Sequence, residues 1–127
     1  MAYGTINVDT LTASTGVLAT QNGMTGIAKA WVNFTGASGG ATINGSFNVS
    51  SITRYGLGAY TINLTTALPS VNYAVNISFA RATGSGGQCQ LSTFTTPTTS
   101  QFSVEFFNYN SASGVDNPYN YISVFGS

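Results

Sequence analysis

Apolar and polar residues alternate along most of the chain with a period of two. The clearest run covers residues 72–80, where the apolar positions are Tyr73, Val75, Ile77 and Phe79. Successive side chains of a β-strand point to opposite faces, so this alternation predicts a strand with one buried and one solvated face. Comparable runs predict strands over 29–35, 42–49, 59–65, 102–106 and 119–125, with shorter strands at 51–53 and around Cys89 and Leu91.

Segments rich in Gly, Ser, Thr and Pro separate these runs, and they predict turns. Residues 54–58 predict a hairpin that joins the strand at 51–53 to the strand at 59–65. Seven or eight short antiparallel strands are typical of a β-sandwich or a jelly roll, so the predicted fold is all-β of one of these two kinds. The predicted core residues are Val32, Phe34, Phe47, Ile62, Val75, Ile77, Phe79, Val104 and Phe106.

Residues 1–26 differ from the rest, because most of them are small or polar and form no apolar face. We predict an extended N-terminal arm over 1–26 and a β-sandwich body over 27–127. Ile6 and Val8 alternate within the arm, and an extended segment of this kind can pair with the edge of a neighbouring sheet. The expected anchor residues are Ile6, Val8, Asp9 and Leu11.

The composition excludes several classes of function. The 127 residues include three Lys or Arg, three Asp or Glu and no His, so the net charge is zero. Binding to nucleic acid or to an anionic membrane needs clustered basic residues, so we expect neither partner. Histidine-based catalytic triads and imidazole metal sites are excluded as well. A neutral chain has little charge repulsion between copies, which favours self-association.

Other features of the sequence concern the size of its core, its location in the cell and its single cysteine. Hydrophobic residues make up 43% of the chain, enough to form the core of one domain. No stretch approaches 18 apolar residues, so no membrane span is expected. The first residues lack the basic start and apolar run of a signal peptide, so we expect synthesis in a cytoplasm. Cys89 has no partner for an intrachain disulfide, and its place in a predicted strand indicates a packed thiol.

Acid–base chemistry would have to come from three carboxylates, Asp9, Glu105 and Asp116. Two carboxylates can form the catalytic pair of a glycosidase, but these three fall in the arm, a strand and a loop, and nothing brings two together. We therefore expect charges that serve solubility, or interface partners of the basic side chains Lys29, Arg54 and Arg81. The sequence predicts no enzyme activity, no catalytic residue, no cofactor and no metal site.

Aromatic side chains are the remaining candidates for binding, because Trp31 and the seven tyrosines have rings that can stack on sugars. For the rings inside predicted strands we favour packing in the core or between subunits. Tyr55 and Tyr119 fall in predicted turns and are the candidates for exposed contact.

Several blocks of the sequence resemble a known group of proteins. Residues 1–16, MAYGTINVDTLTASTG, resemble the start of small virion proteins of tailed phages, cyanophages especially. Residues 26–34 (GIAKAWVNF), 46–53 (SFNVSSIT), 58–64 (GAYTINL) and 73–75 (YAV) are similar to a β module of phage tail fibres. The resemblance covers about residues 1–80, and residues 54–57 replace an acidic turn that family members often have.

The resemblance implies a non-enzymatic structural protein located in the virion. A small body with an arm favours a trimeric capsid decoration (cement) protein that clamps capsid subunits through residues 1–26. The alternative is a tail fibre or tail-tip adhesin module that binds a host surface receptor. The expected partners are further copies of the chain in a homotrimer and the major capsid protein or other virion proteins, with a host surface glycan in the alternative.

Overall fold

The computed structural model describes residues 27–80 and 87–126. This part of the chain forms eight β-strands and no helix, which confirms the all-β prediction. The strands are β1 (Ala30–Ala37), β2 (Gly40–Phe47), β3 (Val49–Gly56), β4 (Ala59–Leu64), β5 (Tyr73–Ala80), β6 (Gly87–Leu91), β7 (Gln101–Asn108) and β8 (Tyr119–Gly126).

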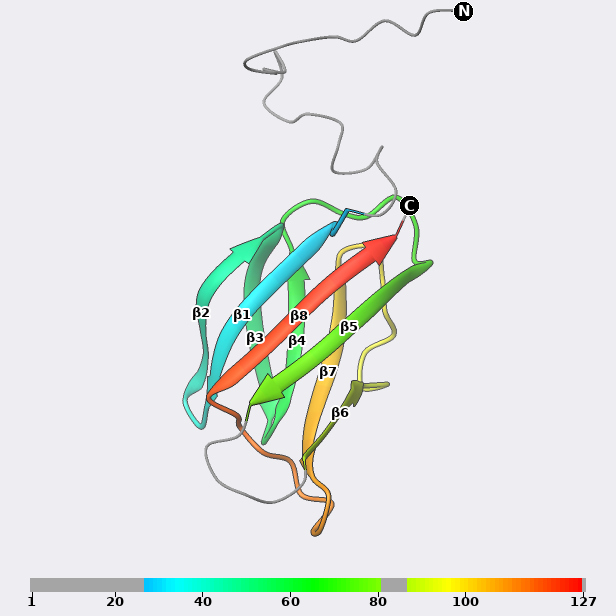
Figure 1. Cartoon of the computed structure of the whole chain (residues 1–127). Helices are drawn as coiled ribbons and strands as arrows, with labels where there is room; N and C mark the ends of the chain where they lie inside the picture. Colours follow the sequence, from blue (N-terminus) through cyan, green and yellow to red (C-terminus); the bar gives the residue numbers. More distant parts are fainter. Residues whose placement is uncertain (1–26, 81–86, 127) are drawn as a thin grey trace, which may run out of the picture.

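The strands form two four-stranded antiparallel sheets that lie one over the other, as in a β-sandwich (Figure 1). Sheet A has the order β2-β1-β8-β5, and sheet B has the order β3-β4-β7-β6. In sheet A, β1 and β8 come from opposite ends of the described chain and lie side by side at the centre. Closing the fold therefore requires pairing across most of the sequence.

Both sheets contribute to one hydrophobic core. The rings of Phe34, Tyr60 and Phe106 pack edge to face at its centre, with Phe34 5.2 Å from Tyr60 between ring centroids. Five predicted core residues are buried there, namely Val32, Phe34, Ile62, Val104 and Phe106. Val75, Ile77 and Phe79 of β5 are half-buried and pack against this cluster from the edge of sheet A.

Phe47 was expected in the core, and the structure corrects this prediction because its side chain is 42% exposed. The pairing of β1 with β2 skips Asn44, so β2 carries one extra residue at that point. A bulge of this kind reverses which side chains face the core beyond it. Ile43 remains opposite Phe34, whereas Phe47 lies opposite Trp31 on the outer face.

The predicted strand over 42–49 is also wrong in extent, because the chain changes sheet at Asn48. This residue has a φ of 56°, in the left-handed region that Asn tolerates better than most residues. Its side-chain amide donates to the carbonyl of Lys29 at 3.0 Å, and its Oδ1 accepts from the amide of Thr66 at 2.7 Å. These bonds hold the corner between β2 and β3, and β3 is longer than the short strand expected at 51–53.

Substitution of two phenylalanines tests this correction. We expect Phe34→Ala to lower the free energy of unfolding by about 3–5 kcal/mol, because it leaves a cavity at the centre of the core. Phe47→Ala removes the same side chain from the outer face and is expected to cost less than about 1 kcal/mol. Urea denaturation of both variants and the parent measures the difference, and equal losses would contradict the bulged register.

Candidate functional site

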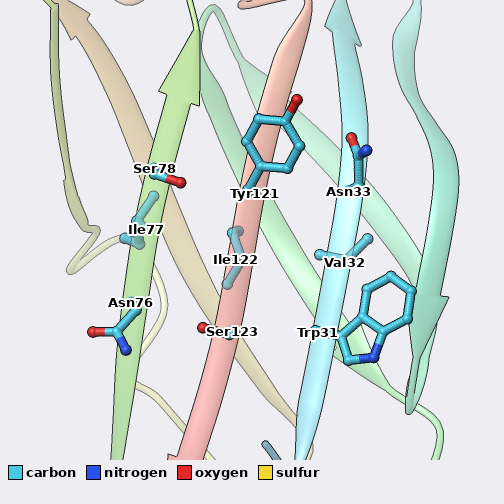
Figure 2. Close-up of a pocket in the computed structure, with 9 residues that line it drawn as sticks. All are labelled: Trp31, Val32, Asn33, Asn76, Ile77, Ser78, Tyr121, Ile122 and Ser123. Carbon is cyan, nitrogen blue, oxygen red and sulfur yellow. The ribbon is translucent and has the colours of Figure 1, made fainter.

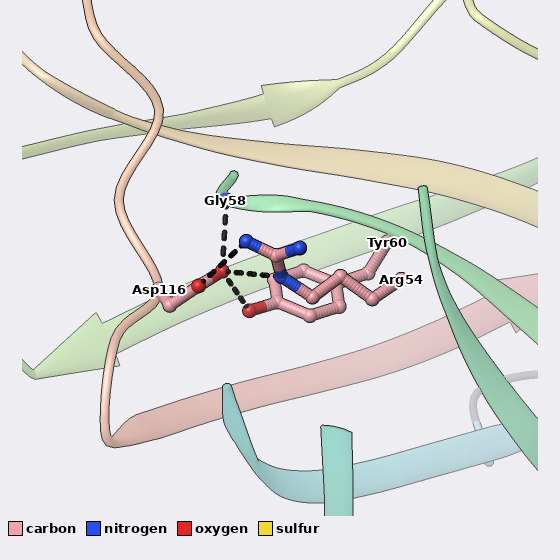
Figure 3. Close-up of polar contacts among 4 residues, drawn as sticks. All are labelled: Arg54, Gly58, Tyr60 and Asp116. Carbon is pink, nitrogen blue, oxygen red and sulfur yellow. Dashed lines mark hydrogen bonds and ion pairs between the residues drawn. The ribbon is translucent and has the colours of Figure 1, made fainter. Parts of the chain in front are cut away.

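The carboxylate of Asp116 lies at a junction of hydrogen bonds between the β7–β8 loop and sheet B (Figure 3). Arg54, near the end of β3, donates to it through Nε at 3.1 Å and through Nη2 at 2.9 Å. The backbone amide of Gly58 donates at 2.9 Å and the hydroxyl of Tyr60 at 2.5 Å. Asp116 was expected either to serve solubility or to be an interface partner of a basic side chain such as Arg54, and the structure pairs it with Arg54 within the chain.

The electrostatics of this junction keep Asp116 ionised. Burial by itself raises the pKa of the Asp116 carboxyl, but the bonds from Arg54, Tyr60 and Gly58 outweigh it and leave that pKa below its ordinary value. Burial, together with the neighbouring carboxylate, raises the pKa of the Tyr60 hydroxyl. The Tyr60 hydroxyl therefore keeps its proton at physiological pH and donates a hydrogen bond to Asp116.

Gly58 is the residue whose backbone makes the junction tight. Its φ of +70° is rare for residues that have a side chain. A Cβ added at Gly58 would also clash with the carbonyl oxygen of Phe106 and the amide nitrogen of Val115. In this close approach, the amide of Phe106 donates to the carbonyl of Gly58 at 2.9 Å, and the amide of Val115 donates to the carbonyl of Phe106 at 2.9 Å. The loop that carries Asp116 is thereby fixed to sheet B.

Glu105 lies in a second polar cluster, on the outer face of sheet B. Its Oε1 accepts from Ser92 Oγ at 2.7 Å and from the Tyr55 hydroxyl at 3.2 Å. The Tyr55 ring stacks on Phe94, with 4.1 Å between centroids and 8° between planes. Burial, followed by the influence of Glu105, raises the pKa of Tyr55. Tyr55 is half-buried within β3, so its predicted place in an exposed turn is wrong.

The two described carboxylates therefore occupy opposite sides of sheet B. Asp116 contacts Tyr60, whose side chain is in the core, whereas Glu105 alternates along β7 with the core residues Val104 and Phe106. They do not face one another as a catalytic pair requires. Across residues 27–80 and 87–126, no three His, Cys, Asp or Glu side chains gather in a group that could hold a metal ion.

The outer face of sheet A carries a shallow groove of about 440 Å³, which we call the sheet A groove (Figure 2). It crosses β1, β8 and β5, and side chains of both aromatic and polar type line it. Its outward-facing residues are Trp31, Asn33, Asn76, Ser78, Tyr121 and Ser123.

Exposed aromatic rings concentrate on this face of the molecule. Trp31, Phe47, Tyr119 and Tyr121 are each between 42% and 52% exposed, and all four belong to sheet A strands. The indole of Trp31 lies over Gly45 of β2, where an added Cβ would be 3.5 Å from the ring. A Cβ at this distance would make an ordinary van der Waals contact with the ring, so the indole covers the sheet closely at Gly45.

None of the four strands of sheet A contains a charged residue. The charged residues that the structure describes are elsewhere: Arg54 and Glu105 are in sheet B, Asp116 is in a loop, and Lys29 is buried just before β1. A face with aromatic rings, amides and hydroxyls but no charge can bind a ligand that is itself uncharged and rich in hydrogen-bonding groups.

The structure places the predicted contact residues differently. Tyr119 is exposed, as expected, but it is the first residue of β8. For rings inside strands, packing in the core or between subunits was expected. Tyr60 is buried in the core, whereas Trp31 and Tyr121 are exposed on the single chain, where packing between subunits stays a prediction. Their positions between apolar or buried neighbours in the alternating pattern already indicate the solvated face. Ile6, Val8, Asp9, Leu11 and Arg81 lie outside the described residues.

Asp116→Asn tests the junction through the pH dependence of stability. Because the pKa of Asp116 is lowered on folding, its carboxylate stabilises the protein at neutral pH, and this contribution is lost as the pH falls through the folded pKa. We expect the variant to lose about 2 kcal/mol at pH 7 and less at pH 3. Denaturant unfolding at both pH values measures this, and a difference that does not change with pH would contradict it.

Comparisons of this chain with protein families, with curated proteins and with solved structures found no match. In the described part of the chain, no helix has the length and apolar character needed to cross a membrane.

Proposed function

We propose that the protein is a non-enzymatic structural protein of a tailed-phage virion, and that it serves as a tail-fibre or tail-tip adhesin module. The observation that carries this proposal is the outer face of sheet A, an uncharged surface with four exposed aromatic rings. Exposed aromatic side chains on a rigid sheet provide a large contact area at a low cost in conformational entropy. The virion assignment rests on the resemblance of residues 1–80.

The non-enzymatic part of the proposal is supported by the bonds of the carboxylates. Asp116 is held by Arg54, Tyr60 and Gly58, and Glu105 accepts hydrogen bonds from Tyr55 and Ser92. Both groups thus act as structural acceptors, and the groove on sheet A contains no ionisable acid or base apart from tyrosine.

A capsid decoration protein is the second candidate, and the charge of the sequence favours it. The zero net charge suits close packing among capsid subunits. In both candidates the protein is a homotrimer held to the particle by an extended arm, residues 1–26. The anchor residues in that arm are Ile6, Val8, Asp9 and Leu11.

The location of the protein on the particle distinguishes the two candidates. We expect density for this chain at the tail in electron micrographs of virions, and purified protein added to host cells is expected to slow phage adsorption. Density on the capsid lattice, with no effect on adsorption, would instead support decoration.

A pair of matched double variants tests the anchor. Ile6→Asp with Val8→Asp places charge on the proposed pairing face, whereas Thr5→Asp with Asn7→Asp places equal charge on the opposite face. We expect the first variant to reduce incorporation into virions at least 10-fold, with the second retained. Quantitative immunoblotting of purified particles measures both, and equal incorporation would contradict an anchor at Ile6 and Val8.

Single amide replacements test the absence of catalysis. Asp9→Asn, Glu105→Gln and Asp116→Asn are expected to leave no hydrolytic activity to lose, because the parent protein is expected to release no reducing sugar from host polysaccharide. Hydrolysis by the parent that one of these replacements abolishes would overturn the proposal in favour of an enzyme.

A further inference from the structure

We propose that the sheet A groove binds a neutral oligosaccharide chain, with Trp31 and Tyr121 stacking on different sugar residues of that chain. This inference rests on the proposed attachment function and names the class of receptor. The groove lies on the sheet face, and both rings are exposed, Trp31 by 44% and Tyr121 by 43% (Figure 2).

The register of the strands places the two rings on one face. Trp31 of β1 pairs with Ser123 of β8, and Tyr121 lies two residues before Ser123 on the same face. The indole extends over Gly45 of β2, whereas the Tyr121 ring extends along β8, so the two rings offer separate contact surfaces (Figure 2). Each ring has a negative face that attracts the C–H face of a pyranose, so the two rings can stack on different sugar residues of one chain.

Polar side chains accompany each ring in its row across the sheet. Ser123 and Asn76 continue the row of Trp31, and Asn33 and Ser78 flank Tyr121. Amides and hydroxyls both donate and accept hydrogen bonds, as sugar hydroxyls do. Each ring therefore stands next to groups that can bind the hydroxyls around the edge of a stacked sugar.

The absence of charge selects the kind of saccharide. The strands of sheet A carry no Lys or Arg to pair with a carboxylate, sulfate or phosphate. Placing an anionic sugar on this face would remove its charge from water without compensation. The same argument excludes the backbone of a nucleic acid.

A peptide strand fits the groove less well than a saccharide does. Peptides dock on sheets through main-chain bonds at an exposed edge. The groove instead crosses three paired strands, with β8 hydrogen-bonded to β1 on one side and to β5 on the other. Recognition at the groove must use side chains that rise from the sheet.

The experiment measures binding of the full-length protein to an array of neutral and acidic oligosaccharides of one to six residues. We expect retention of neutral chains only, with a trisaccharide bound at least 10-fold more tightly than its monosaccharide. Trp31→Ala and Tyr121→Ala are each expected to weaken binding at least 10-fold, and Asn76→Ala is expected to weaken it at least threefold.

Tyr109→Ala is the matched control, because Tyr109 is 70% exposed and lies outside the groove. We expect its binding to equal that of the parent. Circular dichroism and urea unfolding of every variant confirm that the sandwich is intact. Sedimentation of the parent and of Trp31→Ala reports whether the groove joins copies of the chain.

Several results would overturn the inference: no binding across the array, binding of acidic chains alone, or full binding by Trp31→Ala. Loss of self-association in Trp31→Ala without any glycan binding would identify the groove as an interface between copies. Virions carrying Trp31→Ala separate the two proposals. If these virions adsorb less well but the parent protein binds no glycan, the attachment function stands and the receptor is of another kind. If the parent protein binds glycan but these virions adsorb normally, the attachment function alone is contradicted.

Discussion

The contact of Tyr60 with both sheets and with Asp116 is the interaction on which the rest of the structure depends. Its ring packs against Phe34 of sheet A and Phe106 of sheet B, and its hydroxyl donates to Asp116 of the β7–β8 loop. One residue thus joins the apolar core to the polar junction that positions the loop before β8. Because β8 is a central strand of sheet A, the placement of the groove follows from this contact.

The few charged side chains are unevenly distributed between the two sheets. In the described residues, the side chains of Arg54, Glu105 and Asp116 contact sheet B or the loop that packs on it, and Lys29 is buried just before β1. A buried or half-buried carboxylate must be hydrogen-bonded to remain stable, so these groups are used for structure. The strands of sheet A have no charged side chain on their outer face, which suits contact with an uncharged surface.

A flat and rigid face suits an attachment protein for a physical reason. The strands that carry Trp31 and Tyr121 are held by antiparallel pairing on both sides, so the rings keep their spacing before a ligand arrives. Binding then costs little in ordering the protein, and weak contacts to each sugar add along a chain. If the proposed trimer forms, its several copies of the groove increase the overall binding strength through effective concentration.

Local alternation was enough to predict the strands, the two-faced sheets and most of the core, because a side chain on a strand has only two directions. It failed where the period breaks: the bulge at Asn44 turned Phe47 outward, and the left-handed turn at Asn48 divided one expected strand between two sheets. The ion pair of Arg54 and Asp116, 62 residues apart, and the meeting of β1 with β8 were decided by the tertiary structure alone. Such contacts depend on how distant strands stack, which no local pattern records.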